Sequence, residues 1–455
     1  MRLLFSSAIL LLCTSSVLKS QSMQEKIGQM IMVGFGTSQE AQDSLMYDIE
    51  HRNLGGVLMF AYNLDSPSQI KSQNTELQNA ATNYPLFISI DQEGGIVARL
   101  DEQNGYKRTF SAYDLGYTFD LEDSTRATAA LMANWLDNAG FNVNFAPVVD
   151  VNIDPQSPAI GKLKRSFSAN EFDVYQHAGW FIDEFKKQGI LSSIKHFPGH
   201  GSAASDSHLG FTDISTTWQE RELDPFKLLV QDGFDDLIMT GHLYKADWDS
   251  TYPVSLSHHA ITTILRDSLG YEGLVITDEL FMNAIQDNYG MEEAIVNTIN
   301  AGTDILLFST NLYNDISLPN YLIQLISTKV ESGDIPAERI NEAYERIITA
   351  KQEKIITSNE ENLALSDIPS KITISNYPNP FNPTTTVLIT LLEPQEITIS
   401  VYNSIGRKVR TLEKNRMTAG SHSFLFDAYN LASGIYFVRI TGNEIQQTHK
   451  MLLVK

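Results

Sequence analysis

The sequence predicts an α/β fold in which a (β/α)8 barrel is followed by a small all-β sandwich, and three observations support this prediction. The chain has 455 residues, which is enough for two or three domains. Short β-rich runs alternate with helix-length segments over most of the chain, as they do in a parallel barrel. Beyond residue 370 the apolar residues instead recur with a period of two, which is typical of antiparallel strands.

The amino terminus has the layout of an export signal. Arg2 precedes an apolar run over residues 3–12, and small polar residues follow it. The run is too short to span a membrane, so we expect a signal peptide over residues 1–22. The single cysteine, Cys13, lies inside this segment. The mature chain would then have no disulfide and no transmembrane segment. A lipoprotein role for Cys13 is a weaker alternative because bulky Leu12 precedes it.

The barrel is expected over residues 23–356. Its eight expected strands cover residues 30–35, 55–60, 86–91, 142–151, 192–197, 236–242, 273–278 and 304–308. Eight regular repeats favour a closed (β/α)8 TIM barrel over the alternative, a doubly wound sheet. An amphipathic helix over residues 336–354 places Ile340, Tyr344 and Ile347 on one face, and we expect it to pack against the barrel.

The last part of the chain is expected to form a separate domain. Residues 357–370 are polar and are interpreted as a linker. The β-pattern that follows is expected to form an immunoglobulin-like sandwich over residues 371–455. Its expected strands cover residues 386–390, 397–402, 423–426 and 435–440, with turns at Gly406, Gly420, Gly434 and Gly442.

The charge of the chain excludes some classes of partner. The formal net charge is −22, which argues against nucleic acid and against an anionic membrane surface. The hydrophobic content of 42% is ordinary for a globular protein, so the acidity indicates solubility and identifies no substrate.

The densest group of titratable residues lies in one loop. Lys195, His196 and His200 stand beside glycines and a proline, and Asp206 and His208 follow shortly after. Glycine and proline interrupt regular structure, so the group is expected on a loop that bends over a site. One core histidine is easily explained, whereas so many titratable groups in one polar loop indicate chemistry.

Ionisable residues also fall where the expected strands end. Such groups are costly inside a barrel, whereas active sites are built at the carboxyl ends of barrel strands. Five strands end in this way, and the residues concerned are Asp91, Asp150, Lys195 with His196, His242 and Asp278. The sequence therefore predicts one converging site. The alternative for Asp278 is that it caps a helix after a buried strand.

With these residues described, the barrel resembles glycoside hydrolase family 3, specifically its single-barrel β-N-acetylhexosaminidase branch. The resemblance covers most of residues 25–355. The motifs that carry it are IDQEGG at 90–95, APVVD at 146–150, RSF at 165–167, KHFPGHG at 195–201, DSH at 206–208 and ITDEL at 276–280. The KHFPGHG loop followed by DSH is the most specific of them.

The resemblance implies a retaining glycosidase that needs no cofactor and no metal. Asp278 would be the nucleophile that forms a covalent glycosyl-enzyme intermediate. His208, oriented by Asp206, would replace the second carboxylate of the usual pair as the acid/base. A histidine suits both tasks because it titrates near neutral pH.

The remaining motif residues would hold a glycan substrate. The positions that bind the terminal sugar in the family correspond to Asp91, Arg99, Arg165, Lys195 and His196. Asp150, His242 and His200 would line or support the site, and Glu93 is open to a purely structural interpretation. The implied substrates are terminal N-acetyl-β-glucosaminides of chitin or peptidoglycan fragments.

The C-terminal domain is similar to the sorting domain of the type IX secretion route. The resemblance rests on residues 376–383, 433–438 and 450–455. It implies passage through the periplasm of a Bacteroidetes-like bacterium and recognition by the outer-membrane type IX machinery. The protein would then be secreted or held at the cell surface. The alternative is a carbohydrate-binding sandwich, but this domain has no tryptophan to stack against a sugar.

Two departures from the family pattern bear on the leaving group and not on the reaction. Ile96 follows the Gly-Gly pair where a polar residue is common, and residues 159–165 add basic bulk before the RSF motif. Within the family, a β-glucosidase or a β-N-acetylglucosaminide phosphorylase is the nearest alternative. More remote alternatives are a glycan-binding protein with an inactive barrel and a metal-dependent hydrolase, whose ligands would be His196, His200, His242 and Asp278.

Overall fold

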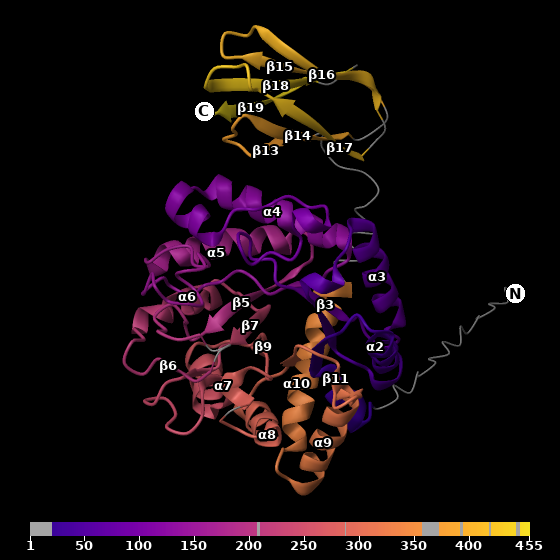
Figure 1. Ribbon diagram of the computed structural model, residues 1–455, viewed down its shortest axis with the longest axis vertical. Helices are drawn as coiled ribbons and strands as arrows, with labels where there is room; N and C mark the ends of the chain where they lie inside the picture. Colours follow the sequence, from indigo (N-terminus) through magenta and orange to yellow (C-terminus); the bar gives the residue numbers. More distant parts are fainter. Residues whose placement is uncertain are drawn as a thin grey trace, which may run out of the picture.

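The computed structural model describes residues 21–206, 210–286, 288–356, 373–391, 395–417, 420–442 and 446–455. The expected linker and nearly all of the expected signal peptide lie outside these residues. Figure 1 shows a barrel of strands surrounded by helices, and a β-sandwich built from the C-terminal end of the chain. The predicted α/β fold with an all-β C-terminal domain is therefore confirmed.

The barrel sheet has eight parallel strands, arranged in the order β10-β1-β2-β3-β4-β5-β7-β9. The strands are β1 (Ile31–Gly34), β2 (Gly56–Met59), β3 (Phe87–Ile90), β4 (Val143–Asn144), β5 (Leu191–Phe197), β7 (Leu237–Thr240), β9 (Leu274–Thr277) and β10 (Leu306–Phe308). All of their residues are buried, as expected for strands that have helices on one side and the barrel interior on the other. Seven of the eight predicted runs contain one of these strands, and the run over residues 192–197 lies within β5, which begins one residue earlier at Leu191.

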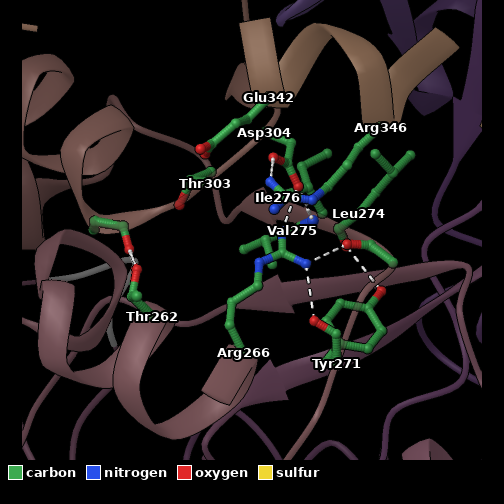
Figure 2. A network of polar contacts seen from close by, with 12 residues as sticks. Thr262, Arg266, Tyr271, Leu274, Val275, Ile276, Thr303, Asp304, Glu342 and Arg346 are labelled. Atoms are coloured by element: carbon green, nitrogen blue, oxygen red, sulfur yellow. Dashed lines mark hydrogen bonds and ion pairs between the residues drawn. The ribbon is translucent and has the colours of Figure 1, made fainter. Parts of the chain in front are cut away.

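The seam between β9 and β10 closes the barrel almost completely. Ile276 and Ile305 form an isolated parallel bridge there, and the Thr277 amide donates to the Ile305 carbonyl at 3.1 Å. Figure 2 shows the polar cluster at this seam, centred on the fully buried Asp304. Its carboxylate accepts hydrogen bonds from Arg266 at 2.6 Å and from Arg339 at 2.8 Å.

Helices cover the outside of the barrel between the strands (Figure 1). They are α1 (Met23–Gln29), α2 (Gln39–Arg52), α3 (Pro67–Ala80), α4 (Glu122–Ala139), α5 (Glu171–Lys186), α6 (Asp224–Gln231), α7 (Asn283–Gln286), α8 (Met291–Ala301), α9 (Leu318–Ser332) and α10 (Ala337–Ala350), with a π-helix η6 (His259–Ser268) between β7 and β9. None of the helices in the described residues is both long enough and apolar enough to cross a membrane.

Local sequence signals fix several helix ends. The Ser66 hydroxyl caps α3 by accepting from the Gln69 amide, and Pro67 occupies the first helical position, where no amide hydrogen is needed. Gly140 ends α4 in the left-handed conformation that glycine adopts without strain.

The C-terminal domain consists of two antiparallel sheets. The strands are β13 (Thr373–Tyr377), β14 (Thr384–Leu391) and β17 (Gly420–Asp427) in one sheet, and β15 (Gln395–Asn403), β16 (Lys408–Met417), β18 (Gly434–Thr441) and β19 (Gln446–Leu453) in the other. Residues such as Val387, Val401, Phe426 and Val438 form a hydrophobic core between the sheets that is distinct from the barrel core.

Candidate active site

The predicted polar residues lie at the carboxyl ends of the barrel strands. Asp91 follows β3, and Asp278 follows β9. Lys195 and His196 lie near the carboxyl end of β5. His242 comes two residues after β7. Because parallel strands present their carboxyl ends at one edge of the barrel, these residues all lie at that edge.

Lys195 is the centre of a buried ionic cluster. Its ammonium group lies 2.8 Å from Asp91 Oδ1 and 2.7 Å from Glu93 Oε1, and its side chain is 3% exposed. Burial opposes the charge of Lys195, but the two carboxylates outweigh that effect and raise its pKa above the usual value. Burial likewise opposes ionisation of Asp91, and the nearby charges of Lys195 and Arg99 still hold its pKa low.

A second cation completes this cluster. Arg165 forms a bidentate ion pair with Glu93, in which both N–O distances are 2.8 Å. The charges of Arg165 and Lys195 overcome the effect of burial and hold the pKa of Glu93 far below its usual range. Arg99 contacts the other oxygen of Asp91 at 3.4 Å. Glu93, for which the sequence left a structural role open, therefore ties together two residues that the resemblance assigns to the sugar.

Asp150 organises the start of the predicted active-site loop. Its carboxylate lies 2.7 Å from His196 Nδ1 and accepts the backbone amides of His196 and His200 at 3.0 and 2.8 Å. Burial disfavours its charge, but the contacts with His196 hold its pKa below the usual value. Burial and the neighbouring His196 lower the pKa of His200 to about 4, so His200 is neutral at physiological pH.

Asp278 is held at the mouth of the barrel by its backbone. Its amide donates to the Thr240 carbonyl at 3.0 Å, and its Oδ1 accepts the Glu279 amide at 2.8 Å. His242 lies beside it, with Nε2 2.9 Å from the Glu279 carbonyl and Nδ1 2.7 Å from the Ser255 hydroxyl. Asp278 is buried, with 8% of the residue exposed.

The loop after β5 is held by residues that the sequence analysis did not single out. The Glu222 carboxylate accepts the Ser202 amide at 3.2 Å, and the Trp218 indole donates to the Pro198 carbonyl at 3.1 Å. Glu222 stands in an acidic, helix-starting segment that looks like a solvated surface. Only the apolar Trp218, which is partly buried, and the nearby Asp224-Pro225 pair indicate a packed turn.

Asp206 is described and is half-buried, whereas its predicted partner His208 lies outside the described residues. Among the described residues, no three histidine, cysteine, aspartate or glutamate side chains are grouped so that they could hold a metal ion. His177, to which the sequence assigned no role, is buried against Thr125 at 2.7 Å. The exposed His258 and His259 lie at the start of η6.

The cluster is suited to a polar, uncharged ligand. Carboxylates accept from hydroxyl groups, and guanidinium and ammonium groups donate to them. The cations and anions already neutralise one another, so the site has no large uncompensated charge to attract an ion. Asp278 adds a further carboxylate, which is 8% exposed.

Two family models match the chain. Residues 22–350 match the glycosyl hydrolase family 3 N terminal domain, and residues 375–455 match the secretion system C-terminal sorting domain. The chain is 32% identical to beta-hexosaminidase A of Pseudoalteromonas piscicida, over 70% of this chain and 56% of that protein. It is 31% identical to beta-hexosaminidase LpqI of Mycobacterium tuberculosis, over 72% of this chain and 83% of that protein.

Solved structures show the same similarity. A family 3 β-N-acetylglucosaminidase from Paenibacillus sp. str. FPU-7 has a TM-score of 0.68 at 33% identity, covering 78% of this chain and 65% of that one. A β-N-acetylhexosaminidase from Beutenbergia cavernae has a TM-score of 0.66 at 26% identity, covering 73% and 99% of the two chains. The chain therefore spans just over half of the Pseudoalteromonas piscicida protein and nearly all of the Beutenbergia cavernae structure.

Proposed function

Because the chain belongs to glycosyl hydrolase family 3, we propose that it is an exported exo-β-N-acetylhexosaminidase. It would release terminal N-acetyl-β-glucosaminides from chitin or peptidoglycan fragments. The names of the relatives support this substrate, since they are hexosaminidases and a β-N-acetylglucosaminidase. The compensated polar cluster around Lys195 is the observation that carries the proposal, because it suits a neutral, hydroxyl-rich ligand.

In this proposal the cluster binds the terminal sugar. Asp91 and Glu93 hold Lys195 in place while the outer edges of the cluster remain available to hydroxyl groups. Arg99 and Arg165, with 28% and 10% of their side chains exposed, and His196 would complete the contacts. Asp150 fixes the ring of His196 through Nδ1 and so directs Nε2 toward the side of Arg165.

We propose that Asp278 is the nucleophile of a retaining mechanism. Its carboxylate would attack the anomeric carbon as the glycosidic C–O bond breaks, and His208 would give a proton to the departing oxygen. The neutral His208 would then take a proton from water, which attacks the glycosyl-enzyme ester and frees Asp278. Asp206 would orient His208 throughout. The position of Asp278 after β9 supports the first role, because catalytic residues of barrels lie at strand ends.

We further propose that the C-terminal domain directs export by the type IX route. The match of residues 375–455 to a sorting domain supports secretion or surface display. The finer assignments are a signal peptide over residues 1–22, periplasmic passage and a Bacteroidetes-like host. Sheets of three and four antiparallel strands are also compatible with the immunoglobulin-like type.

The experiment that tests the substrate compares 4-nitrophenyl N-acetyl-β-D-glucosaminide with the matching β-D-glucoside, using the full mature chain. Strong preference for the N-acetyl sugar supports the proposal. Preference for the glucoside contradicts the substrate but keeps the family reaction. Addition of phosphate distinguishes hydrolysis from phosphorolysis, because a phosphorylase releases a sugar 1-phosphate. Loss of activity with a strong chelator would favour a metal-dependent mechanism, and no turnover of either substrate would favour glycan binding alone.

A further inference from the structure

The first half of the loop between β5 and Asp206 is packed tightly against the barrel. Residues 198–203 are all buried. A side chain on Gly201 would place its Cβ only 1.7 Å from the Val151 carbonyl oxygen, so the backbones of the two loops are in direct contact. This half of the loop therefore sets the direction in which the chain runs toward Asp206.

Two buried carboxylates hold this segment through its backbone. Asp150 accepts the His200 amide at 2.8 Å. Glu222 accepts the Ser202 amide at 3.2 Å, and its other oxygen accepts the Gln219 amide at 3.0 Å. Glu222 has no exposed surface. Its carboxylate therefore links the loop to the turn that leads into α6.

Glu222 also packs closely against the loop at Gly199. Gly199 has a φ of +120°, and a Cβ placed there would lie 2.7 Å from the Glu222 Cβ. Beside this contact, the Trp218 indole donates to the Pro198 carbonyl at 3.1 Å. The turn of residues 218–222 thus contacts the loop at Pro198, Gly199 and Ser202. Glu222 makes two of these three contacts.

We propose that Glu222 is a positioning residue for general acid/base catalysis: it holds residues 198–203, the described segment that leads to Asp206 and, beyond the described residues, to the proposed acid/base His208. The inference rests on the proposed function, because it needs the acid/base to be carried by that loop. Glu222 touches neither substrate nor the reacting atoms in this account. Its effect is transmitted through the Ser202 amide, four residues before Asp206.

A displaced loop would have a kinetic signature. Proton transfer requires the acid to lie within hydrogen-bond reach of the departing oxygen, and a displacement of about 1 Å costs about 100-fold in rate. Proton donation matters greatly for a sugar leaving group and little for 4-nitrophenolate, which departs without a proton. A misplaced loop should therefore slow the two classes of substrate unequally, whereas a general loss of folded enzyme should slow both equally.

The test measures kcat and KM for Glu222→Ala and Glu222→Gln with diacetylchitobiose and with 4-nitrophenyl N-acetyl-β-D-glucosaminide. For Glu222→Ala we expect kcat on diacetylchitobiose to fall by about 10- to 100-fold, with a loss below about threefold on the aryl substrate. KM should change little, since the sugar-binding cluster is untouched. Glu222→Gln keeps one acceptor oxygen and the same shape, so its loss should be smaller and in the same direction.

Two reference variants make the result decisive. Asp48→Asn removes another buried carboxylate, on α2 and paired with Arg52 and Ser317, and should affect both substrates alike. His208→Ala should show the leaving-group effect in full. Equal losses on both substrates in both Glu222 variants, with the effect present in His208→Ala, would overturn the inference alone. No leaving-group effect in His208→Ala would overturn the acid/base assignment and the inference with it. Glu222→Gln keeps the test valid if Glu222→Ala does not fold.

Discussion

Lys195 keeps its charge in an almost solvent-free position because two carboxylates face its ammonium group. Removing either partner of such a pair leaves a buried charge uncompensated, which is more costly than the pair itself is stabilising. The same reasoning applies to Glu93, which is shared by Lys195 and Arg165. The ion pairs hold these side chains in place, so under the proposed function little ordering would be needed when a sugar binds.

The carboxyl group of Glu222 gives a pH-dependent stability. Burial raises its pKa to about 7 from an ordinary value of 4.5. The folded state therefore holds this proton more tightly than the unfolded chain does. This group destabilises the fold fully above about pH 7, and the effect vanishes below about pH 4.5. Relative to Glu222→Gln, the wild type should lose about 3 kcal/mol of unfolding free energy as pH rises across this window.

Urea denaturation of both proteins at several pH values measures this difference. Comparison with Glu222→Gln cancels the titration of all other groups that the two proteins share. A difference that stays constant from pH 4.5 to 7.5 would show that Glu222 has an ordinary pKa in the folded protein.

At this scale the sequence identified most of the residues that the structure brings together. Ionisable residues at strand ends are visible in a sequence because they interrupt apolar runs. Glu222 was missed because the local sequence around a buried acid in a turn does not differ from that around an exposed one. The role of Glu93 was left open for a related reason: only the folded structure shows that Arg165, which lies 72 residues away, pairs with it.

The barrel seam depends on one residue that serves three elements. Asp304 precedes β10 and accepts the Val275 amide of β9 at 3.0 Å (Figure 2). It also pairs with Arg266 of η6 and with Arg339 of α10. Asp304→Asn should lower the unfolding free energy by about 3–5 kcal/mol, since the buried arginines lose their counter-charge. Chemical denaturation measures the loss. Asp334→Asn, an exposed carboxylate near Lys329, is the control, and an equal effect there would contradict this account.

The elements were predicted best where their residues are buried. All eight barrel strands were found because helices cover one side of the sheet, which makes the strands continuous apolar runs. The run over residues 142–151 is shorter in the structure, since β4 ends at Asn144 and Pro147 lacks an amide hydrogen for the ladder. The edge strand β16 was missed because Lys408–Met417 is mostly exposed and charged, which hides its period of two.

The whole molecule combines two units with separate cores and opposite charge. Residues 371–455 contain nine Lys and Arg against five Asp and Glu, whereas the complete chain has a net charge of −22. The sandwich core contains only residues of the C-terminal domain. Calorimetry should therefore show two unfolding transitions, and a chain ending at residue 356 should keep only the barrel transition with kcat/KM unchanged. A single transition, or loss of activity on truncation, would show that the barrel depends on the sandwich.

The central claim is that this barrel uses Asp278 as the nucleophile of an N-acetyl-β-glucosaminidase. The most direct measurement is turnover of 4-nitrophenyl N-acetyl-β-D-glucosaminide by Asp278→Ala, with and without azide. We predict a loss of several orders of magnitude, as expected when a nucleophile is removed. Azide should restore turnover and give the α-glycosyl azide, because it attacks from the face that Asp278 occupied. Near-normal activity of Asp278→Ala without azide would contradict the account.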